Sequence, residues 1–416
     1  MVLKISAKQL IYIQIIYNCI AKFLITDIHF PSMINYITDI INVCLLYLVL
    51  RKNQGIIKGK VVEPLFLVVC LLLVSTISFL LDFTSPFLYL WSFRNIYRFF
   101  VFFYCCTQIL VMEDYYRILD ILEKIFIVNV VVCLYEYMVR GIKYDYLGGL
   151  FGNGTTGGNG PLNALMIIVS TYVIIEYVNK KKNMKEVLSI IVMCLFLSAV
   201  GELKFFYFEM IAIILFVLVF VTRNLKMLCF VLGICIAGAV SLHFYAILYP
   251  TNAGFLSLDF IQYYAMSNSY GSATDINRLS AIQMIHEKFF NGNIKRIWFG
   301  LGMGNGESAQ YSFLTSWFYR LHGDSVKYNW FSHAFMYVET GYIGLTLYVS
   351  IFLMIFLKAF LHRKSSDLMQ FTAIIALLSM VLLVYNQTMR LETMGYTMFL
   401  LLAFPFITMN CQGEIE

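Results

Sequence analysis

Long apolar stretches recur along the chain at lengths that match the thickness of a lipid bilayer. A helix needs about 20 mainly apolar residues to cross the hydrocarbon core, and a window of about 19 residues finds such stretches at about twelve places. The composition agrees, because 60% of the residues are hydrophobic and 13% are charged, whereas about a quarter of a soluble domain is charged. We therefore predict an all-α, polytopic transmembrane helical bundle. The predicted spans are 9–26, 33–50, 64–81, 96–112, 118–138, 161–178, 187–200, 205–222, 226–248, 331–357, 370–386 and 393–410.

Lysine and arginine gather in alternate short loops between these predicted spans. One set of loops holds sixteen basic residues, namely Lys4, Lys8, Arg51, Lys52, Lys58, Lys60, Arg117, Lys180, Lys181, Lys182, Lys185, Arg223, Lys226, Lys358, Arg363 and Lys364. The other set holds few, namely Arg94, Arg140, Lys143, Lys204 and Arg390. Because short cytoplasmic loops carry the excess of basic residues, we expect both termini in the cytoplasm and the segment 249–330 outside. The protein should be a multi-pass protein of the inner (plasma) membrane.

This topology divides the chain into three parts. Residues 1–248 hold the first nine spans, 249–330 form one large extracytoplasmic loop, and 331–416 hold the last three spans and a cytoplasmic tail. All ten cysteines fall in predicted spans or in that tail, so we expect no disulfide outside, and no Cys/His cluster suggests a metal site. The net charge of +6 lies in short clusters between apolar stretches, which indicates membrane topology and no nucleic-acid partner.

Ionisable residues in or near membrane spans are candidates for functional residues, because placing a charge in hydrocarbon costs free energy. Arg94 and Arg98 lie four residues apart at the start of the fourth predicted span and would share one helix face. Together they could bind a phosphate through paired N–H donors. The alternative is that both side chains extend to the bilayer interface, which the neighbouring Trp91 and Tyr97 also favour.

A glycine-rich segment precedes the sixth predicted span. Residues 148–160 contain seven glycines and are followed by Pro161. Such a loop lets the backbone approach a ligand closely, and the N–H groups at a helix start attract anions. A plain flexible connector is the alternative, since the segment matches neither the Walker nor the Rossmann pattern.

Lys204 opens the eighth predicted span, after a tight turn that contains Gly201 and Glu202. At that place its ammonium group could contact a phosphate. It could equally pair with Glu202 or extend to the interface.

The large loop and the helix after it hold the most specific pattern. Residues 278–290 place apolar side chains at 279, 282, 285 and 289, which predicts an amphipathic helix lying on the membrane. A glycine turn follows at 298–306, and the chain re-enters the bilayer at 332–345. There His333 lies one turn inside the helix mouth, with Glu339 and two glycines below it. A lone interfacial histidine is often structural, so the pattern by itself leaves its role open.

The order of these features resembles the O-antigen polymerase and O-antigen ligase superfamily. In that family a large outer loop lies late in the chain and a histidine follows it. By resemblance, Arg278 takes the place of the family's loop arginine and His333 that of its histidine. The residues that carry the resemblance are Arg278-Leu279 at a helix start, the turn Phe299-Gly-Leu-Gly302, and His333 ahead of Glu339-Thr-Gly-Tyr-Ile-Gly344.

Two positions depart from the family's pattern. The chain has Leu203-Lys204 where the family more often has Ser-Arg, and Ala334 after the histidine where the family commonly has Asn. These departures weigh more against the ligase branch than against the polymerase branch.

The resemblance implies a GT-C-like fold and an inverting glycosyl transfer on the outer face. A glycan on undecaprenyl pyrophosphate would be the donor, a hydroxyl of a second lipid-linked glycan would be the acceptor, and neither a nucleotide sugar, a metal nor another cofactor would be needed. We therefore expect a polymerase of lipid-linked repeat units of an O-antigen, capsule or exopolysaccharide. A chain-length regulator and a flippase of the same pathway are the expected protein partners.

The chemistry of this transfer suggests roles for the outer residues. A leaving pyrophosphate needs cations at the membrane surface, and the attacking hydroxyl needs a base that titrates near the working pH. The expected pyrophosphate contacts are Arg278, Lys204, Arg94 and Arg98. The expected catalytic residues are His333 and Glu339.

Three other functions remain open on the sequence alone. A ligase would share the mechanism and differ in its acceptor. A transporter or flippase of lipid-linked glycans would use the same basic residues to line a path, although the sequence shows no inverted repeat and no matched pair of broken spans. A scaffold without catalytic activity would leave the outer charged residues unexplained.

Overall fold

The computed structural model describes residues 6–54, 61–153, 158–221, 225–257 and 275–407, together with 259, 260 and 262. Some residues of the predictions above lie outside this part of the chain. They are Lys4, Lys58, Lys60, Arg223, Cys411, the centre of the glycine-rich segment at 154–157 and most of the loop from 258 to 274.

The described part of the chain is all-α and contains no β-strand, as the sequence predicts. A helix lies at every place where a span is predicted. In chain order these helices are α1 (Ala7–Thr26), α2 (Ile37–Lys52), α3 (Val62–Leu81), α4 (Pro86–Ile109), α5 (Met112–Met138), α6 (Asn159–Val178), α7 (Met184–Val200), α8 (Lys204–Phe216), α9 (Leu225–Leu248), α14 (Ser332–Leu361), α15 (Asp367–Tyr385) and α16 (Glu392–Leu402).

Eight helices of the described chain are long and apolar enough to cross a membrane. They include α1, α3, α6, α14 and α15 in full; α2 counts together with the 3₁₀ turn before it, α8 together with the π-helix Val217–Val221 after it, and α9 from Cys229 on. Two of the other four are shorter, since α7 has 17 residues and α16 has 11. The eight helices identify a bundle suited to a membrane.

The exposed side chains of α3 show what this bundle turns outward. Apart from Leu81 at its end, its exposed apolar residues repeat every three or four positions and so follow one face of the helix; they are Val62, Phe66, Val69, Leu73, Ile77 and Leu80. A soluble monomer rarely exposes a stripe of this kind. By contrast, α6 is buried on nearly all sides. The apolar stripe of α3 is therefore the kind of surface that lipid covers.

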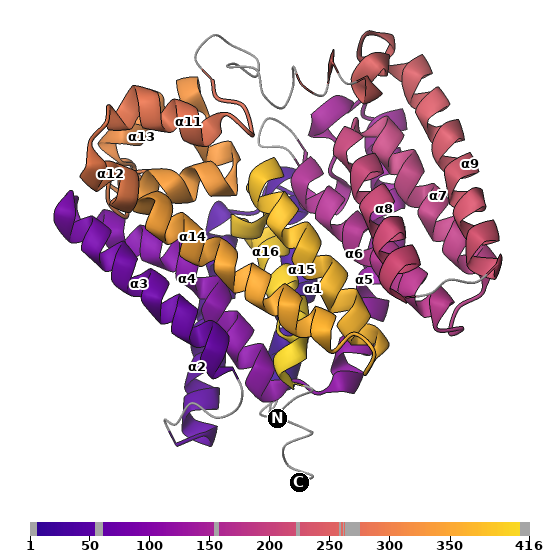
Figure 1. The fold of residues 1–416 in the computed structure, drawn as a ribbon, viewed down its shortest axis with the longest axis horizontal. Helices are drawn as coiled ribbons and strands as arrows, with labels where there is room; N and C mark the ends of the chain where they lie inside the picture. Colours follow the sequence, from indigo (N-terminus) through magenta and orange to yellow (C-terminus); the bar gives the residue numbers. More distant parts are fainter. Residues whose placement is uncertain are drawn as a thin grey trace.

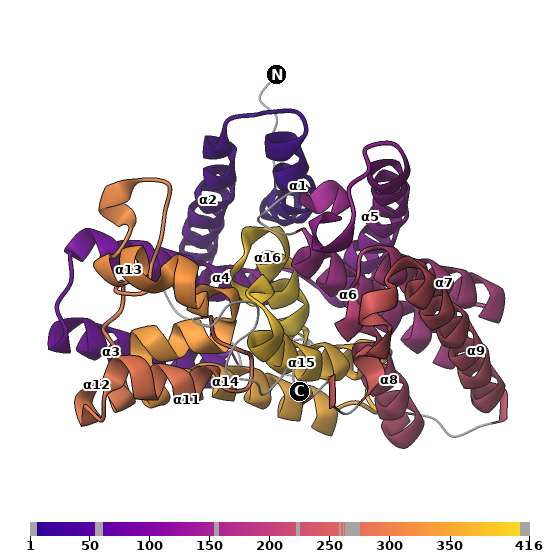
Figure 2. The same ribbon diagram turned by 90° about the horizontal axis from the view of Figure 1, so that it is seen from above.

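Three short helices of the large loop pack at one flank of the bundle. They are α11 (Ala281–Ile285), α12 (Ile294–Phe299) and α13 (Trp317–Val326). Both views show these helices near α3 on one flank, α6–α9 on the other, and α15 and α16 between the two (Figures 1 and 2). The large loop thus lies directly against the membrane-type helices.

A short amphipathic helix is present at the predicted place, and three of the four predicted apolar positions, 282, 285 and 289, pack against the core. It consists of α11 and a π-helix, His286–Phe290. Leu279 is exposed, whereas Ala281, Met284 and Ile285 are buried, and α11 contacts α14. Leu279 lies in the turn before the first residue of α11, so it does not share this packed face.

The tenth predicted span is interrupted near its start. α14 contains a residue with non-helical backbone, Gly341, at φ 62°. A Cβ at Gly341 would lie 2.5 Å from the backbone nitrogen of Phe299, and one at Gly300 would lie 2.5 Å from the carbonyl carbon of Glu339. Only glycine allows this backbone and this approach. The break therefore gives the glycine turn of the large loop a place to dock.

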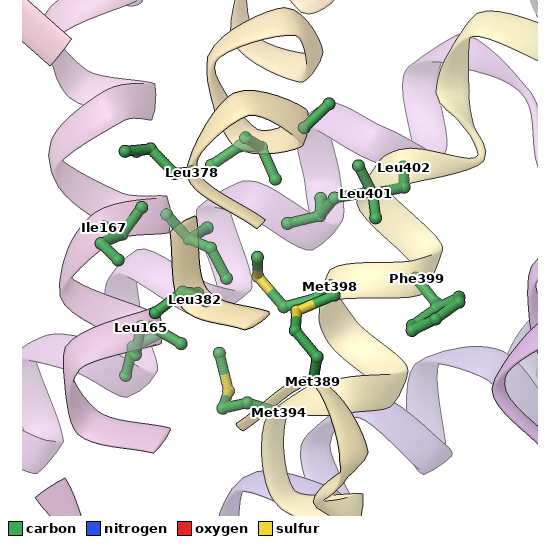
Figure 3. Packing of buried hydrophobic residues seen from close by; sticks show 14 of the residues in the cluster. Leu165, Ile167, Leu378, Leu382, Met389, Met394, Met398, Phe399, Leu401 and Leu402 are labelled. Carbon is green, nitrogen blue, oxygen red and sulfur yellow. The ribbon is translucent and has the colours of Figure 1, made fainter. Parts of the chain in front are cut away.

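A dense apolar core holds the last two helices in place. Figure 3 shows Leu165 and Ile167 of α6 and Leu378 and Leu382 of α15 around the methionines of the following segment. Among the buried residues of that segment, the figure labels Met389, Met394, Met398, Phe399, Leu401 and Leu402. Close packing makes such a core stiff. It thereby fixes the 3₁₀ turn Thr388–Arg390 and the start of α16, which carry charged residues of the site described below.

Ion pairs in the described chain respect the two sides predicted from the loops. On the side predicted as cytoplasmic they are Lys8–Asp114, Lys181–Glu176, Lys181–Asp367, Lys182–Glu123 and Lys358–Glu63. On the other side they are Arg94–Asp39, Arg94–Glu392, Arg98–Asp39, Arg98–Glu392, Arg140–Asp27, Lys204–Glu202, Lys295–Asp82, Arg296–Asp82 and Lys327–Asp275. None of these pairs joins the two sides. The positions of these ion pairs are therefore compatible with helices that cross the membrane in alternating directions, as predicted.

Candidate functional site

Two adjoining cavities lie where the large loop meets α4, α6 and the segment between α15 and α16. The arginine cavity has a volume of about 270 Å³ and is lined by Trp91, Arg94, Asn95, Arg98, Gly306, Glu307, Ser308, Asn329, Phe335, Gln387, Arg390, Leu391 and Glu392. The wide cavity has a volume of about 680 Å³. Three residues line both cavities, namely Asn329, Gln387 and Leu391. Together they form a hollow of the size that proteins use for small ligands.

Arg94 and Arg98 stand side by side in the wall of the arginine cavity, as their spacing on α4 predicts. Glu392, the first residue of α16, accepts a hydrogen bond from Nη2 of Arg94 at 3.0 Å and one from Nη1 of Arg98. Asp39 of α2 accepts from Nε of Arg94 at 3.0 Å. The guanidinium of Arg94 also lies 4.8 Å from the ring centroid of Trp91. Both arginines are thus held by carboxylates from distant helices.

Arg390 and Glu307 complete the charged wall of this cavity. The guanidinium of Arg390 lies 3.3 Å from the ring centroid of Phe335 and makes no ion pair within the described chain. Glu307 is 4% exposed, and its Oε2 accepts a hydrogen bond from Asn95 at 3.1 Å. Burial raises the pKa of Glu307, which the nearby Arg390 opposes. Burial lowers the pKa of Arg390, which Glu307 opposes in turn.

Several buried polar atoms of the arginine cavity have no hydrogen-bond partner among the described residues. They are Nε1 of Trp91, Nε of Arg98, Oε1 of Glu307, Oδ1 of Asn329 and Nη1 of Arg390. A buried polar group left unpaired costs about 1–3 kcal/mol. The cavity therefore offers both donors and acceptors to whatever polar group enters it.

The wide cavity brings Arg278 together with the end of the glycine-rich segment. Its lining is Tyr144, Asp145, Tyr146, Asn159, Gly160, Pro161, Leu203, Arg278, Tyr319, Asn329, Trp330, Phe331, Tyr385, Asn386, Gln387, Thr388 and Leu391. Nε of Arg278 donates to the backbone carbonyl of Tyr385 at 3.2 Å, and the guanidinium lies 4.9 Å from that ring's centroid. The guanidinium is thus fixed in orientation beside the cavity.

The first part of the glycine-rich segment is packed rather than loose. The N–H of Gly149 donates to Glu136 at 2.8 Å, and that of Leu150 donates to the side chain of Asn129 at 2.6 Å. A Cβ at Gly149 would lie 2.8 Å from the sulfur of Cys133. These glycines allow close packing against α5, and of the described part of the segment and its flank, residues 159–161 line the wide cavity.

Lys204 lies beside the site but lines neither cavity. Its Nζ is 3.0 Å from Oε1 of Glu202, which is the pairing that the sequence left as an alternative. The neighbouring Leu203 forms part of the wide cavity's wall.

His333 is placed between the large loop and α15. Its Nε2 lies 2.9 Å from the backbone carbonyl oxygen of Arg278, and its Nδ1 lies 3.2 Å from that of Leu383. The side chain is 7% exposed and lines neither of the two cavities. Because both ring nitrogens face carbonyl oxygens, neither is free to accept a proton from a substrate in this conformation.

Glu339 holds the glycine turn of the large loop. Its carboxylate is fully buried and accepts hydrogen bonds from the N–H groups of Gly304 at 2.9 Å and Gly306 at 2.7 Å. The hydroxyl of Ser92 donates to the same carboxylate at 2.5 Å. These bonds use the carboxylate oxygens to join α4, α14 and the turn.

Most residues of the arginine cavity were missed as site residues. They include Glu307, Asn329, Arg390 and Glu392. A signal existed for two of them, since Arg390 and Glu392 flank the start of the last predicted span, where ionisable residues are informative. Glu307 directly follows the glycine turn, but nothing in the sequence indicates that it faces Arg390.

The described chain contains no group of three or more His, Cys, Asp or Glu side chains arranged to hold a metal ion. No protein-family model matches the chain, and no curated protein is detectably similar to it.

Proposed function

We propose that the protein is a glycosyltransferase that polymerises undecaprenyl-pyrophosphate-linked oligosaccharide repeat units. The observation that carries this proposal is the joined hollow lined by four arginines, one in the wide cavity and three in the arginine cavity. The product would be an O-antigen, a capsule or an exopolysaccharide. Donor and acceptor would both be lipid-linked glycans.

The lining of the hollow suits both halves of such a donor. Guanidinium groups bind phosphate through paired N–H donors and keep their charge when partly buried. The aromatic and amide side chains of the wide cavity, including Tyr319, Trp330 and Asn386, suit sugar rings and hydroxyls. The long apolar helices beside the hollow provide a path for a polyprenyl chain.

The proposed topology has twelve crossings in a GT-C-like fold. Both termini lie in the cytoplasm and the large loop lies outside the inner membrane, which the segregated ion pairs support. Reporter fusions after Lys182 and after Gly292 should report opposite compartments. Finding both in one compartment would contradict this topology and the outward placement of the hollow.

The contacts support the following residue roles in this proposal. Arg278, Arg94 and Arg98 would bind the pyrophosphate. The positive charge of Lys204 would make the electrostatic potential near the wide cavity more favourable for this anion. Glu339 would hold the glycine turn in place. For His333 to act as the base predicted from the sequence, its Nε2 would have to leave the carbonyl of Arg278.

Reconstitution tests the proposal directly. Purified protein in nanodiscs receives undecaprenyl-pyrophosphate repeat units as the only glycan, with EDTA and without nucleotide sugar. We expect products that grow by whole repeat units and the release of undecaprenyl pyrophosphate. Protein-free nanodiscs are the control.

Other outcomes of this experiment would replace the proposal. Movement of the lipid across the bilayer without elongation would indicate a transporter. Transfer only after a lipid A core acceptor is added would indicate a ligase. A chain-length regulator and a flippase of the same pathway are the partners that we expect in the cell.

A further inference from the structure

Glycosyl transfer to a hydroxyl requires a group that accepts the hydroxyl proton. The two residues predicted for this task are engaged elsewhere, because His333 contacts two backbone carbonyls and Glu339 accepts from two backbone N–H groups and a hydroxyl. Neither is placed to take a proton in the hollow. A different carboxylate lines the arginine cavity, and one of its oxygens accepts no hydrogen bond from a described residue.

That carboxylate is Glu307. Its backbone is fixed, because its carbonyl accepts a hydrogen bond from the N–H of Ser316 at 2.9 Å, and the preceding carbonyl of Gly306 accepts one from the hydroxyl of Tyr328 at 2.7 Å. Its Oε2 is oriented by Asn95. Its Oε1 is buried in the cavity wall without a partner among the described residues. A rigid carboxylate with one unpartnered oxygen thus lies in the wall of the cavity.

The same cavity holds the groups that a leaving pyrophosphate needs. Nε of Arg98 and Nη1 of Arg390 are buried there and lack a hydrogen-bond partner within the described chain. A proton acceptor and unpartnered N–H groups of two arginines therefore lie in the wall of one cavity of about 270 Å³. Preorganised donors of this kind stabilise developing negative charge without reorganising at the moment of reaction.

We infer that Glu307 is the general base of the transfer and that Arg98 and Arg390 bind the leaving pyrophosphate in the arginine cavity. This inference rests on the proposed function. The acceptor hydroxyl oxygen forms a bond to the anomeric carbon of the donor while its proton passes to Oε1 of Glu307. The bond from that carbon to the phosphate oxygen breaks, and undecaprenyl pyrophosphate leaves with the electron pair.

The first test compares Glu307→Gln with a matched control. Glutamine keeps the size of the side chain and can still contact Asn95, but it cannot serve as the base. We expect polymerisation in nanodiscs to fall about 10²- to 10⁴-fold, while donor binding is unchanged and the melting temperature is not lowered. Glu287→Gln makes the same change at an exposed position of the same loop and should leave the rate unchanged.

A second test separates catalysis from structure. Azide carries no proton, so it can attack the anomeric carbon without a base, forming a carbon–nitrogen bond as undecaprenyl pyrophosphate leaves. Glu307→Ala should therefore release undecaprenyl pyrophosphate and glycosyl azide when azide is added, while it fails to polymerise. Glu307→Asp keeps the charge beside Arg390 but withdraws the carboxylate, and it should lower kcat without changing KM.

The outcomes separate this inference from the proposed function. A wild-type protein that does not polymerise defeats the proposed function itself. A wild type that polymerises alongside a fully active Glu307→Gln variant defeats the inference alone. So does a Glu307→Ala variant that binds donor normally but gives no azide product, because Glu307 would then be structural. If neither the Gln nor the Ala variant folds, a change in KM alone for Glu307→Asp would also overturn the inference.

Discussion

Nε2 of His333 lies 2.9 Å from the backbone carbonyl oxygen of Arg278, and the side chain of Arg278 in turn donates to the carbonyl of Tyr385. Arg278 is therefore fixed at two points near the end of α15, once through its backbone and once through its guanidinium. In this arrangement His333 would act as a positioning residue for the arginine of the wide cavity. The sequence had suggested a base at His333, and the two roles lead to different expectations for its variants.

Replacing His333 with alanine should remove the hydrogen bond between its Nε2 and the backbone carbonyl of Arg278. Each hydrogen bond of this kind contributes about 0.5–1.5 kcal/mol, so we expect a modest loss of stability, a weaker donor affinity and a slower polymerisation. His333→Gln can restore one hydrogen bond and should recover part of both donor affinity and rate. Donor binding to the nanodisc-embedded variants measures this. Normal donor binding with no polymerisation in either variant would favour His333 as the base after all.

Adding a methyl group at Gly341 should disturb the docking of the glycine turn. The residue has φ 62°, and its Cβ would lie 2.5 Å from the backbone nitrogen of Phe299. A non-glycine residue in this region costs about 1–3 kcal/mol before the clash is counted. We expect Gly341→Ala to lower the melting temperature clearly and to reduce activity.

Gly238→Ala is the matched control for that variant. Nothing lies within 4 Å of a Cβ built at Gly238, which is also in an apolar helix. We expect no loss of stability there, since alanine favours a helix more than glycine does. Equal melting temperatures for the two variants would mean that the non-helical backbone at Gly341 does not contribute to stability.

The positions of the helices could be predicted because they depend on local sequence. Apolar length alone located helices at all twelve places, and the spacing of Arg94 and Arg98 correctly put them on one face. Their partners could not be predicted in this way. Glu392 lies 298 residues from Arg94 along the chain, and no local pattern tells which carboxylate meets which arginine.

The contacts of the glycine turn also could not be predicted from the sequence. The run of glycines predicted a turn, but the sequence did not show that Glu339 satisfies its backbone N–H groups. Glu339 and Glu307 are both buried glutamates near one turn, and only the contacts separate them. One carboxylate accepts three hydrogen bonds, and the other has a buried oxygen without a partner among the described residues.

Removing the guanidinium of Arg278 should abolish most of the activity. Loss of one preorganised donor to a developing negative charge typically costs about 10²- to 10³-fold in rate. We expect Arg278→Ala to make little or no polymer while it remains inserted, and Arg278→Lys to recover only part, because an ammonium does not reproduce the guanidinium fork. Polymer length on gels, measured at equal protein level, checks this. Arg320→Ala removes an exposed arginine of the same loop and should have no effect.

The pH dependence of the reaction should report the state of Glu307. Burial raises its pKa, which Arg390 and Arg98 oppose, and the carboxylate of Glu339 and the hydroxyl of Tyr328 also lie in its field. A base must be deprotonated, so kcat/KM should fall as the pH drops through this raised pKa, at a pH above the usual range for glutamate.

The free energy of unfolding should change with pH in the opposite direction. A carboxyl whose pKa is raised by folding favours the folded state at low pH, and it loses that contribution as the pH rises through the folded pKa. In Glu307→Gln both the acid limb of the residual rate and this share of the pH-dependent stability should disappear. An acid limb that persists unchanged in the glutamine variant would assign the titration to another group.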